Sequence, residues 1–184
     1  IFIGSFAALA SYALFHMVTI FPLSWIYLGD TQAISNVLAI QIIGAIIGMG
    51  GTVFSGWIAD RIGKRTTVAS LAVLIGIFSL FTPMLMNGSP LQQDLFILIG
   101  FALLGVSYGQ AAGTVTTNFE RRFRYTGAAL TSDFAWLFGA AFAPLVALGL
   151  SANFGLAYVS VYLLSGVVCT LLALRINKSL EASD

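Results

Sequence analysis

The charged residues of this chain leave long uncharged segments, and this pattern constrains the fold more than any motif does. No Asp, Glu, Lys or Arg occurs in 1–29, 31–59 or 134–174. A helix needs about 20 apolar residues to cross the hydrocarbon core of a bilayer, so the first two segments each suit one crossing and the third suits two. With 59% hydrophobic and 8% charged residues, the chain also lies outside the composition of water-soluble domains. The sequence therefore predicts an all-α integral membrane protein.

Turn residues divide these segments into six predicted transmembrane helices. Breaks are expected at Gly29-Asp30, at the basic stretch 60–65, at Asn87-Gly88, at the second basic stretch 120–126 and at the polar stretch 151–155. Pro144 lies inside the fifth helix and predicts a kink there. The predicted crossings are about 3–28, 33–58, 66–86, 90–117, 127–150 and 156–176.

The basic residues predict the orientation of these crossings. With six crossings, the loop after the second helix, the loop after the fourth and the C-terminus share one side of the membrane. All eight Lys and Arg residues fall in these three places: Arg61, Lys64, Arg65, Arg121, Arg122, Arg124, Arg175 and Lys178. Since Lys and Arg are retained on the cytoplasmic side, we expect both termini to be cytoplasmic. The net charge of +1 gives no reason to expect a nucleic-acid partner.

Small and polar residues predict which helix faces pack and which line a cavity. Gly44, Gly48, Thr52 and Gly56 recur every four residues in the second helix, and Gly105, Gly109 and Gly113 do so in the fourth, as in close helix crossings. Polar side chains predict a cavity for a polar substrate; those of the fourth helix lie on the face opposite its glycines, whereas Gln41 shares the glycine face of the second helix. The candidates are Tyr12, His16 and Thr19 in the first helix, Gln41 in the second, and Ser107, Gln110 and Thr114 in the fourth.

Two ionisable residues are expected inside or near the bilayer, away from the ends of the chain's charged loops. His16 is near the middle of the first helix, where a polar side chain usually points inward. It either hydrogen-bonds a neighbouring helix or contacts substrate or protons. Asp133 lies near the cytoplasmic end of the fifth helix, where a carboxylate must be paired or protonated. An ion pair with Arg124 or Arg61 and a role in proton coupling or gating are the two interpretations.

The first basic stretch carries the clearest motif, Gly56, Asp60, Arg61, Gly63, Lys64 and Arg65 in the spacing G-x-x-x-D-R-x-G-K-R. We expect Gly56 to allow close packing at a helix end, and Gly63 to adopt a positive φ in a sharp turn. Asp60 is expected just before the next helix, near its positive N-terminal end. This spacing resembles the loop signature of the major facilitator superfamily of secondary transporters.

The second basic stretch narrows the resemblance. Phe119, Arg122, Arg124, Tyr125, Thr126, Gly127, Ala128 and Leu130, followed by Gly139 and Ala143-Pro144, are similar to the metabolite:proton symporter family, which includes proline/betaine, shikimate and α-ketoglutarate carriers. Thr117 and Glu120 depart from the family's pattern. The resemblance implies that 1–184 is the C-terminal half of a twelve-helix carrier, built from two three-helix repeats. It also implies an absent N-terminal half, a bacterial inner membrane, and protons with a small organic acid or zwitterion as transported species.

Other interpretations remain open at this point. A six-helix half-transporter acting as a homodimer or heterodimer would suit the glycine stripes. A start at Ile1 rather than Met leads us to expect a fragment of a longer protein, inactive alone. The sequence has no paired catalytic carboxylates, no nucleophile beside a base and no cluster of metal ligands, so we expect neither an enzyme nor a cofactor or metal site.

Overall fold

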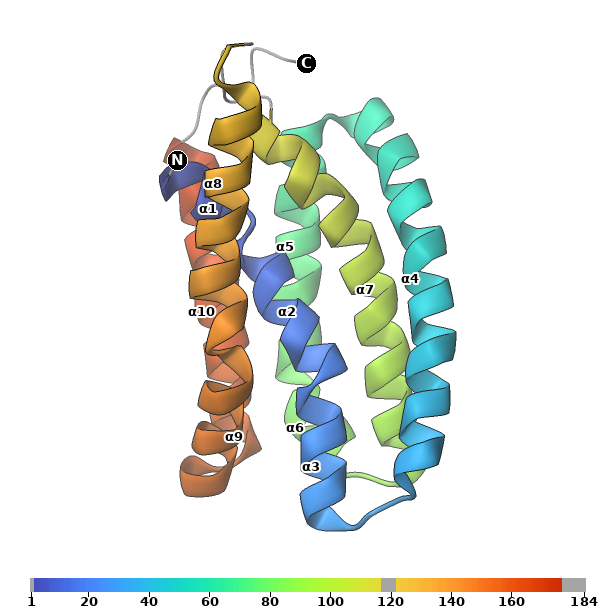
Figure 1. Cartoon of the computed structure of the whole chain (residues 1–184). Helices are drawn as coiled ribbons and strands as arrows, with labels where there is room; N and C mark the ends of the chain where they lie inside the picture. Colours follow the sequence, from blue (N-terminus) through green and yellow to red (C-terminus); the bar gives the residue numbers. More distant parts are fainter. Residues whose placement is uncertain (1, 117–121, 177–184) are drawn as a thin grey trace.

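The structure, a computed structural model, describes residues 2–116 and 122–176, leaving aside the side chains of 2–4 and 111–116. Every regular element in this part of the chain is helical, and the helices run up and down along one long axis (Figure 1). Five segments are long and apolar enough to cross a membrane: Leu9–Gly29, Ile34–Ile62, Pro90–Gln110, Arg124–Phe154 and Leu156–Ile176. The predicted all-α membrane architecture is confirmed at this level.

The first predicted crossing is not one helix, as expected, but three: α1 (Phe2–Ala7), α2 (Leu9–Thr19) and α3 (Phe21–Gly29). Pro22 lies in the first turn of α3, and its ring nitrogen cannot donate a hydrogen bond to the carbonyl of Val18. Gln41 of the neighbouring helix compensates, because its Nε2 donates to the carbonyl oxygens of Thr19 at 2.6 Å and Val18 at 3.4 Å. A side chain from another helix thus provides hydrogen bonds to the backbone carbonyls at the break between α2 and α3.

Helices α4 (Ile34–Ile62) and α7 (Pro90–Thr116) cross closely through their glycines, as the four-residue spacing predicted. A Cβ on Gly44 would lie 2.8 Å from the Phe101 ring, and a Cβ on Gly105 would overlap the backbone of Gly48. The hydroxyl of Thr52 lies 3.1 Å from the carbonyl oxygens of both Gly48 and Gly105 and links the two helices.

The third predicted crossing, 66–86, is divided between α5 (Lys64–Leu80) and α6 (Thr82–Met86). Pro83 lies in the first turn of α6, which repeats the arrangement at Pro22. α5 alone has 17 residues, slightly fewer than the length needed to cross a bilayer.

The fifth predicted crossing, 127–150, begins earlier and ends later than expected. It comprises α8 (Arg124–Trp136), the π-helix η1 (Leu137–Ala141) and α9 (Ala143–Phe154). The helix is interrupted where the kink was predicted, since Pro144 lies in the first turn of α9, shortly after the π-helix. Gly155, with φ of 90°, separates α9 from α10 (Leu156–Ile176).

The first basic motif fits the structure in part. Gly63 has φ of 83° between α4 and α5, as predicted. Asp60 does not precede α5, because α4 continues to Ile62 and Gly63 is the residue before α5. Gly56 makes no close helix contact either, since a Cβ there would meet nothing within 4 Å. Arg61 lies over the ring of Trp57, with 4.1 Å from its Cζ to the ring centroid.

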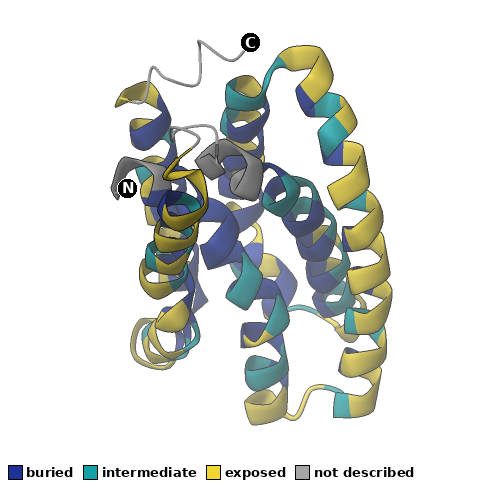
Figure 2. Ribbon diagram, turned by 45° about the horizontal axis from the view of Figure 1, so that its top comes forward, coloured by how far each residue is buried: buried dark blue, intermediate teal, exposed yellow. Residues whose placement is uncertain are grey.

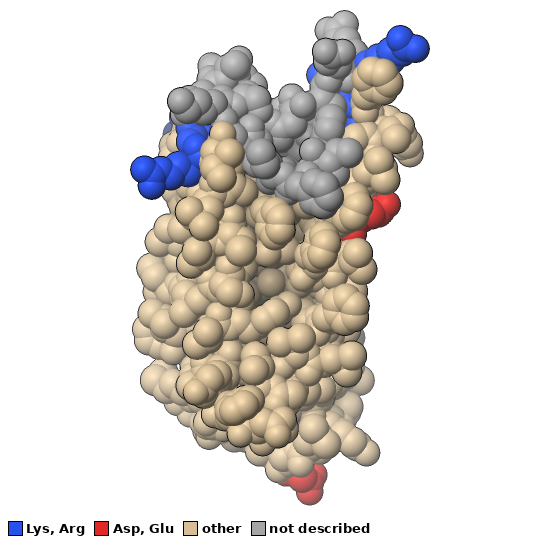
Figure 3. Space-filling model, turned by 90° about the vertical axis from the view of Figure 1, so that its left-hand side faces the viewer, with Lys and Arg blue, Asp and Glu red and all other residues tan. Residues whose placement is uncertain are grey.

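The described basic residues share one end of the bundle. Figure 1 places the α4–α5 junction, the beginning of α8 and the end of α10 at this end, while the α3–α4, α6–α7 and α9–α10 connections lie at the other. Arg61, Lys64 and Arg65 belong to the first of these places, Arg122 and Arg124 to the second, and Arg175 to the third. Blue side chains accordingly gather at the top of Figure 3. Arg121 and Lys178 lie outside the described residues.

The core is formed mainly by α2, α5, α7 and α10, and α4 is the helix least covered by the rest of the chain (Figure 2). Only 17% of the most apolar part of α4 is buried, against 61% in Leu9–Gly29. Large apolar side chains on α4 therefore face outward, among them Ile42, Ile46, Met49 and Val53.

Candidate functional site

Five ring side chains from three helices meet inside the bundle, and they form the aromatic cluster around His16. Tyr12, Phe15 and His16 come from α2, Tyr108 from α7 and Trp136 from α8. The ring of Tyr12 lies edge-on to Tyr108 and Trp136, with centroid separations of 5.7 and 5.0 Å. Such edge-to-face pairs stabilise a packed cluster beyond the burial of apolar area.

His16 is the member of this cluster that has a buried polar atom without a hydrogen-bond partner in the described part of the chain. Its ring lies edge-on to Phe15 at 5.2 Å and to Trp136 at 5.9 Å. Its Nδ1 is buried and has no hydrogen-bond partner among the described residues. A helix-bridging hydrogen bond through Nδ1, one of the two interpretations of the sequence, is therefore not seen. A buried nitrogen without a partner is energetically unfavourable, and such groups often belong to functional sites.

Tyr12 connects the aromatic cluster to the acidic residue of the fifth crossing. Its hydroxyl shares a hydrogen bond with that of Ser132 in α8, with 3.0 Å between the oxygens. Asp133 is the next residue, and it is exposed. The ion pair of Asp133 with Arg124 or Arg61 stays a prediction.

Two predicted cavity residues, Gln41 and Thr19, instead form hydrogen bonds with the backbone near the break in the first predicted crossing. Gln41 donates to the backbone of Val18 and Thr19, as described above. The Thr19 hydroxyl donates to the carbonyl of Phe15 within its own helix, at 2.7 Å. In this conformation their polar atoms satisfy backbone groups rather than face an open space.

The polar residues of α7 were expected on a face away from its glycines, and this expectation is wrong for Gln110. Its amide donates to the hydroxyl of Ser55 in α4 at 3.1 Å, beside the contact made by Gly109. One residue turns a helix by about 100°, so a long side chain next to Gly109 still reaches the same neighbour. Ser107 is buried and donates to the carbonyl of Leu104. The side chain of Thr114 lies outside the described residues.

A cavity of about 190 Å³ adjoins the aromatic cluster between α2, α4 and α7. Phe15 and Tyr108 line one side of it, and Gly48, Thr52 and Gly105 line another. Its lining residues are mostly apolar, and two of them, Thr52 and Tyr108, carry a hydroxyl group. It therefore brings the glycine crossing and the aromatic cluster to one place, which neither sequence pattern indicates alone.

The second basic motif lies at the beginning of α8. The helix begins at Arg124, and Gly127 is buried and donates its N–H to the carbonyl of Phe123 at 2.8 Å. Tyr125 is 91% exposed, so its match to the motif has no explanation in packing within this chain. Arg122 lies beside Phe123, and Thr126 is exposed. Phe119 lies outside the described residues.

Sequence reasoning missed four members of the site: Phe15, Tyr108, Ser132 and Trp136. The three aromatic residues carry no local signal, because a bulky apolar ring in a membrane helix is most often a packing residue. Ser132 precedes the candidate Asp133, but only the contact between α2 and α8 brings it to Tyr12.

Comparison with known proteins relates the chain to metabolite transport proteins. It is 32% identical over 181 residues to the Inner membrane metabolite transport protein YhjE of Escherichia coli, which covers 95% of this chain and 41% of that protein. Two proteins of Haemophilus influenzae that are named for metabolite transport are 30% and 32% identical to it, over 99% and 94% of the chain. The chain thus spans 41–44% of the length of these curated relatives. Neither a protein-family model nor a solved structure matches it.

Proposed function

We propose that this chain is the C-terminal half of a proton-coupled secondary transporter for a small polar metabolite in a bacterial inner membrane. It crosses the membrane six times, with α5 and α6 together forming the third crossing, and both of its ends are cytoplasmic. The similarity to metabolite transport proteins over nearly the whole chain carries this proposal. The gathering of basic residues at one end supports the orientation.

The pattern of helix contacts supports two three-helix repeats. α4, the second crossing, packs mainly on α7, the fourth. Correspondingly, the fifth crossing (α8, η1 and α9) packs on the first, through α1 and α2. α5 packs on α10, and α2 contacts α7. These are the contacts expected when crossings one to three and four to six exchange places by a pseudo-two-fold rotation, as in transporter repeats.

The outward apolar face of α4 suits contact with a second protein segment as well as with lipid. We propose that the N-terminal half of the carrier lies against this side of the bundle, so that the substrate site is completed by residues from both halves. Alternating access requires two halves that rock about a central site, and this chain alone is therefore inactive.

Within this half, we propose that the aromatic cluster around His16 contacts the substrate. The unpartnered Nδ1 of His16 supports this assignment, because a hydrogen-bonding metabolite would satisfy it. The cavity beside Phe15 and Tyr108 would admit such a molecule. We further propose that Asp133, exposed next to the Tyr12–Ser132 hydrogen bond, takes part in proton coupling or gating.

A reconstitution experiment tests the transport function. The complete carrier is placed in liposomes that contain a pH-sensitive dye, and pools of organic acids and zwitterions are added outside. Proton symport predicts acidification inside the liposomes that requires both the carrier and one pool. An absence of substrate-dependent proton movement for every pool would contradict the proposal.

The same assay separates the half-transporter interpretation from the proposed one. The 184-residue chain is reconstituted alone, beside the complete carrier. We expect no proton movement from the chain alone. Activity of the chain by itself, together with a dimer on size-exclusion chromatography, would instead establish a half-transporter.

A further inference from the structure

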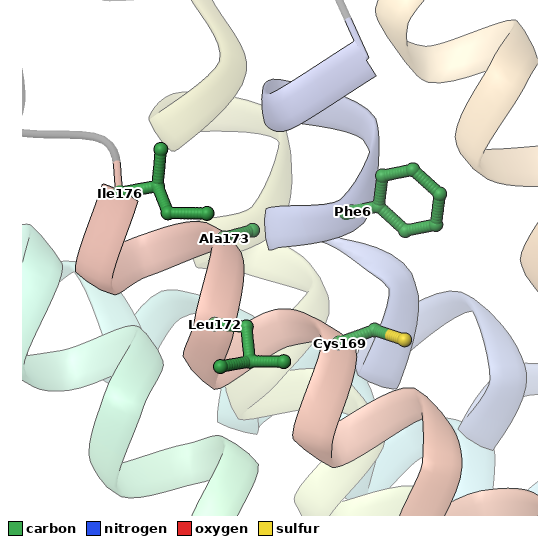
Figure 4. Close-up of a pocket in the computed structure, with 5 residues that line it drawn as sticks. All are labelled: Phe6, Cys169, Leu172, Ala173 and Ile176. Carbon is green, nitrogen blue, oxygen red and sulfur yellow. The ribbon is translucent and has the colours of Figure 1, made fainter.

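An apolar groove lies on the surface between α1 and α10, away from the aromatic cluster. Figure 4 shows its two walls: Cys169, Leu172, Ala173 and Ile176 follow one side of α10, and Phe6 comes from α1. Its volume is about 260 Å³, and the thiol of Cys169 is its most polar lining group. A groove without hydrogen-bonding side chains does not suit a polar metabolite, so its occupant must be a hydrocarbon.

The groove lies at a defined depth. Its α10 residues occupy the last turns of that helix, at the end of the bundle where the described basic residues gather (Figure 1). Residues 169–176 cover about 10 Å along the helix axis. They therefore lie where the upper part of a lipid acyl chain meets its headgroup.

A positively charged residue adjoins the groove residues along α10. Arg175 is exposed in the last turn of α10, three residues after Leu172 and one before Ile176, which line the groove. Long Arg side chains at helix ends extend toward the headgroups and place the guanidinium beside lipid phosphates. The guanidinium binds phosphate oxygens through two parallel hydrogen bonds.

We propose that this groove is a binding site for an anionic phospholipid, which inserts one acyl chain between α1 and α10 while Arg175 binds its headgroup phosphate. The apolar lining suits an acyl chain, and the adjacent Arg175 would favour a headgroup with net negative charge. This inference requires only a membrane setting, so it does not depend on the proposed transport function.

Lipid retention tests the site directly. The purified chain is mixed with phosphatidylglycerol or phosphatidylcholine in detergent, and bound lipids are counted by native mass spectrometry. We expect one retained phosphatidylglycerol, with about fivefold preference over phosphatidylcholine, the factor that one basic residue contributes near an anionic headgroup. Arg175→Gln should remove the preference, and Arg175→Lys should keep most of it.

Filling the groove tests the acyl-chain part. Cys169→Phe places a ring in the groove and should abolish retention of the lipid. Val161→Phe is the matched control, because Val161 is 59% exposed on the same helix but does not line the groove. Thermal unfolding of both variants checks that they are folded. Retention of phosphatidylglycerol by folded Cys169→Phe at the wild-type level would overturn the proposal.

The single cysteine gives a second readout without substitution, because Cys169 is the only Cys in the sequence. In nanodiscs, a membrane-permeant maleimide should alkylate Cys169 several-fold more slowly when phosphatidylglycerol is present. Arg175→Gln should remove this protection. Slow alkylation that is independent of the lipid would mean that another part of the protein covers the groove, and it would overturn the lipid site.

Discussion

At the scale of single residues, glycines decide how closely α4 and α7 approach. Gly105 has no space for a side chain, because a Cβ there would overlap the backbone of Gly48. Gly50 is in the same helix as Gly48, but a Cβ on it would meet nothing within 4 Å. Glycines of the α4–α7 helix pair therefore differ sharply in what they contribute to packing.

We expect Gly105→Leu to destabilise the chain by about 3 kcal/mol or more, because backbone atoms cannot move aside as a flexible side chain does. Thermal unfolding in detergent measures the effect. Gly50→Leu is the matched control and should unfold near the wild-type temperature. Equal stability of the two variants would show that the α4–α7 crossing is not as close as described.

His16 offers a residue-scale test of the substrate site. If its ring contacts the metabolite, His16→Ala in the complete carrier should lower uptake about tenfold or more while membrane abundance stays unchanged. Uptake is measured per molecule, with abundance taken from an epitope tag. Reduced abundance with normal uptake per molecule would assign His16 to packing alone.

At the scale of elements, proline-containing breaks occur in three of the six predicted crossings. Pro22, Pro83 and Pro144 each lie in the first turn of a helix that follows a break, at α3, α6 and α9. At the break before α3, another helix supplies the hydrogen bonds, since Gln41 of α4 donates to the carbonyls of Val18 and Thr19. This contact couples the bend of the first crossing to the position of the second.

We expect Gln41→Leu to destabilise the chain by about 1–3 kcal/mol, because it leaves two buried carbonyl groups unsatisfied. Pro22→Ala restores an N–H that can pair with the carbonyl of Val18 but not with that of Thr19, so it should offset part of this loss in the double variant. The free energies of unfolding of the two single variants and the double variant give the coupling energy. Additive effects would mean that Gln41 does not stabilise the break.

At the scale of the whole molecule, the common end of the basic residues predicts the membrane topology. Reporter fusions near Lys64, Arg122 and Lys178 should be cytoplasmic, and fusions near Asp30, Ser89 and Asn153 should be external. Fusions at Asp30 and Ser89 matter most, since they lie on either side of the region that contains α5 and α6. If they reported opposite sides, α5 and α6 together would not cross the membrane.

The sequence by itself determined the features that depend on neighbours along the chain. Uncharged segments predicted helices of membrane-spanning length, Gly63 predicted a turn with positive φ, and Pro144 predicted a kink. The glycine spacing also predicted the close face of α4 and α7. Hydrophobicity, backbone freedom and proline geometry are local properties, so they can be recognised without the fold.

Only the tertiary structure decided which side chains meet. Nearly every face of these helices is apolar, so the sequence does not specify how each helix is rotated about its axis. Gln110 therefore contacts Ser55 rather than a cavity, and Gln41 contacts the break in the first crossing. The aromatic cluster around His16 likewise exists because α2, α7 and α8 pack together, and that packing depends on contacts between residues far apart in the chain.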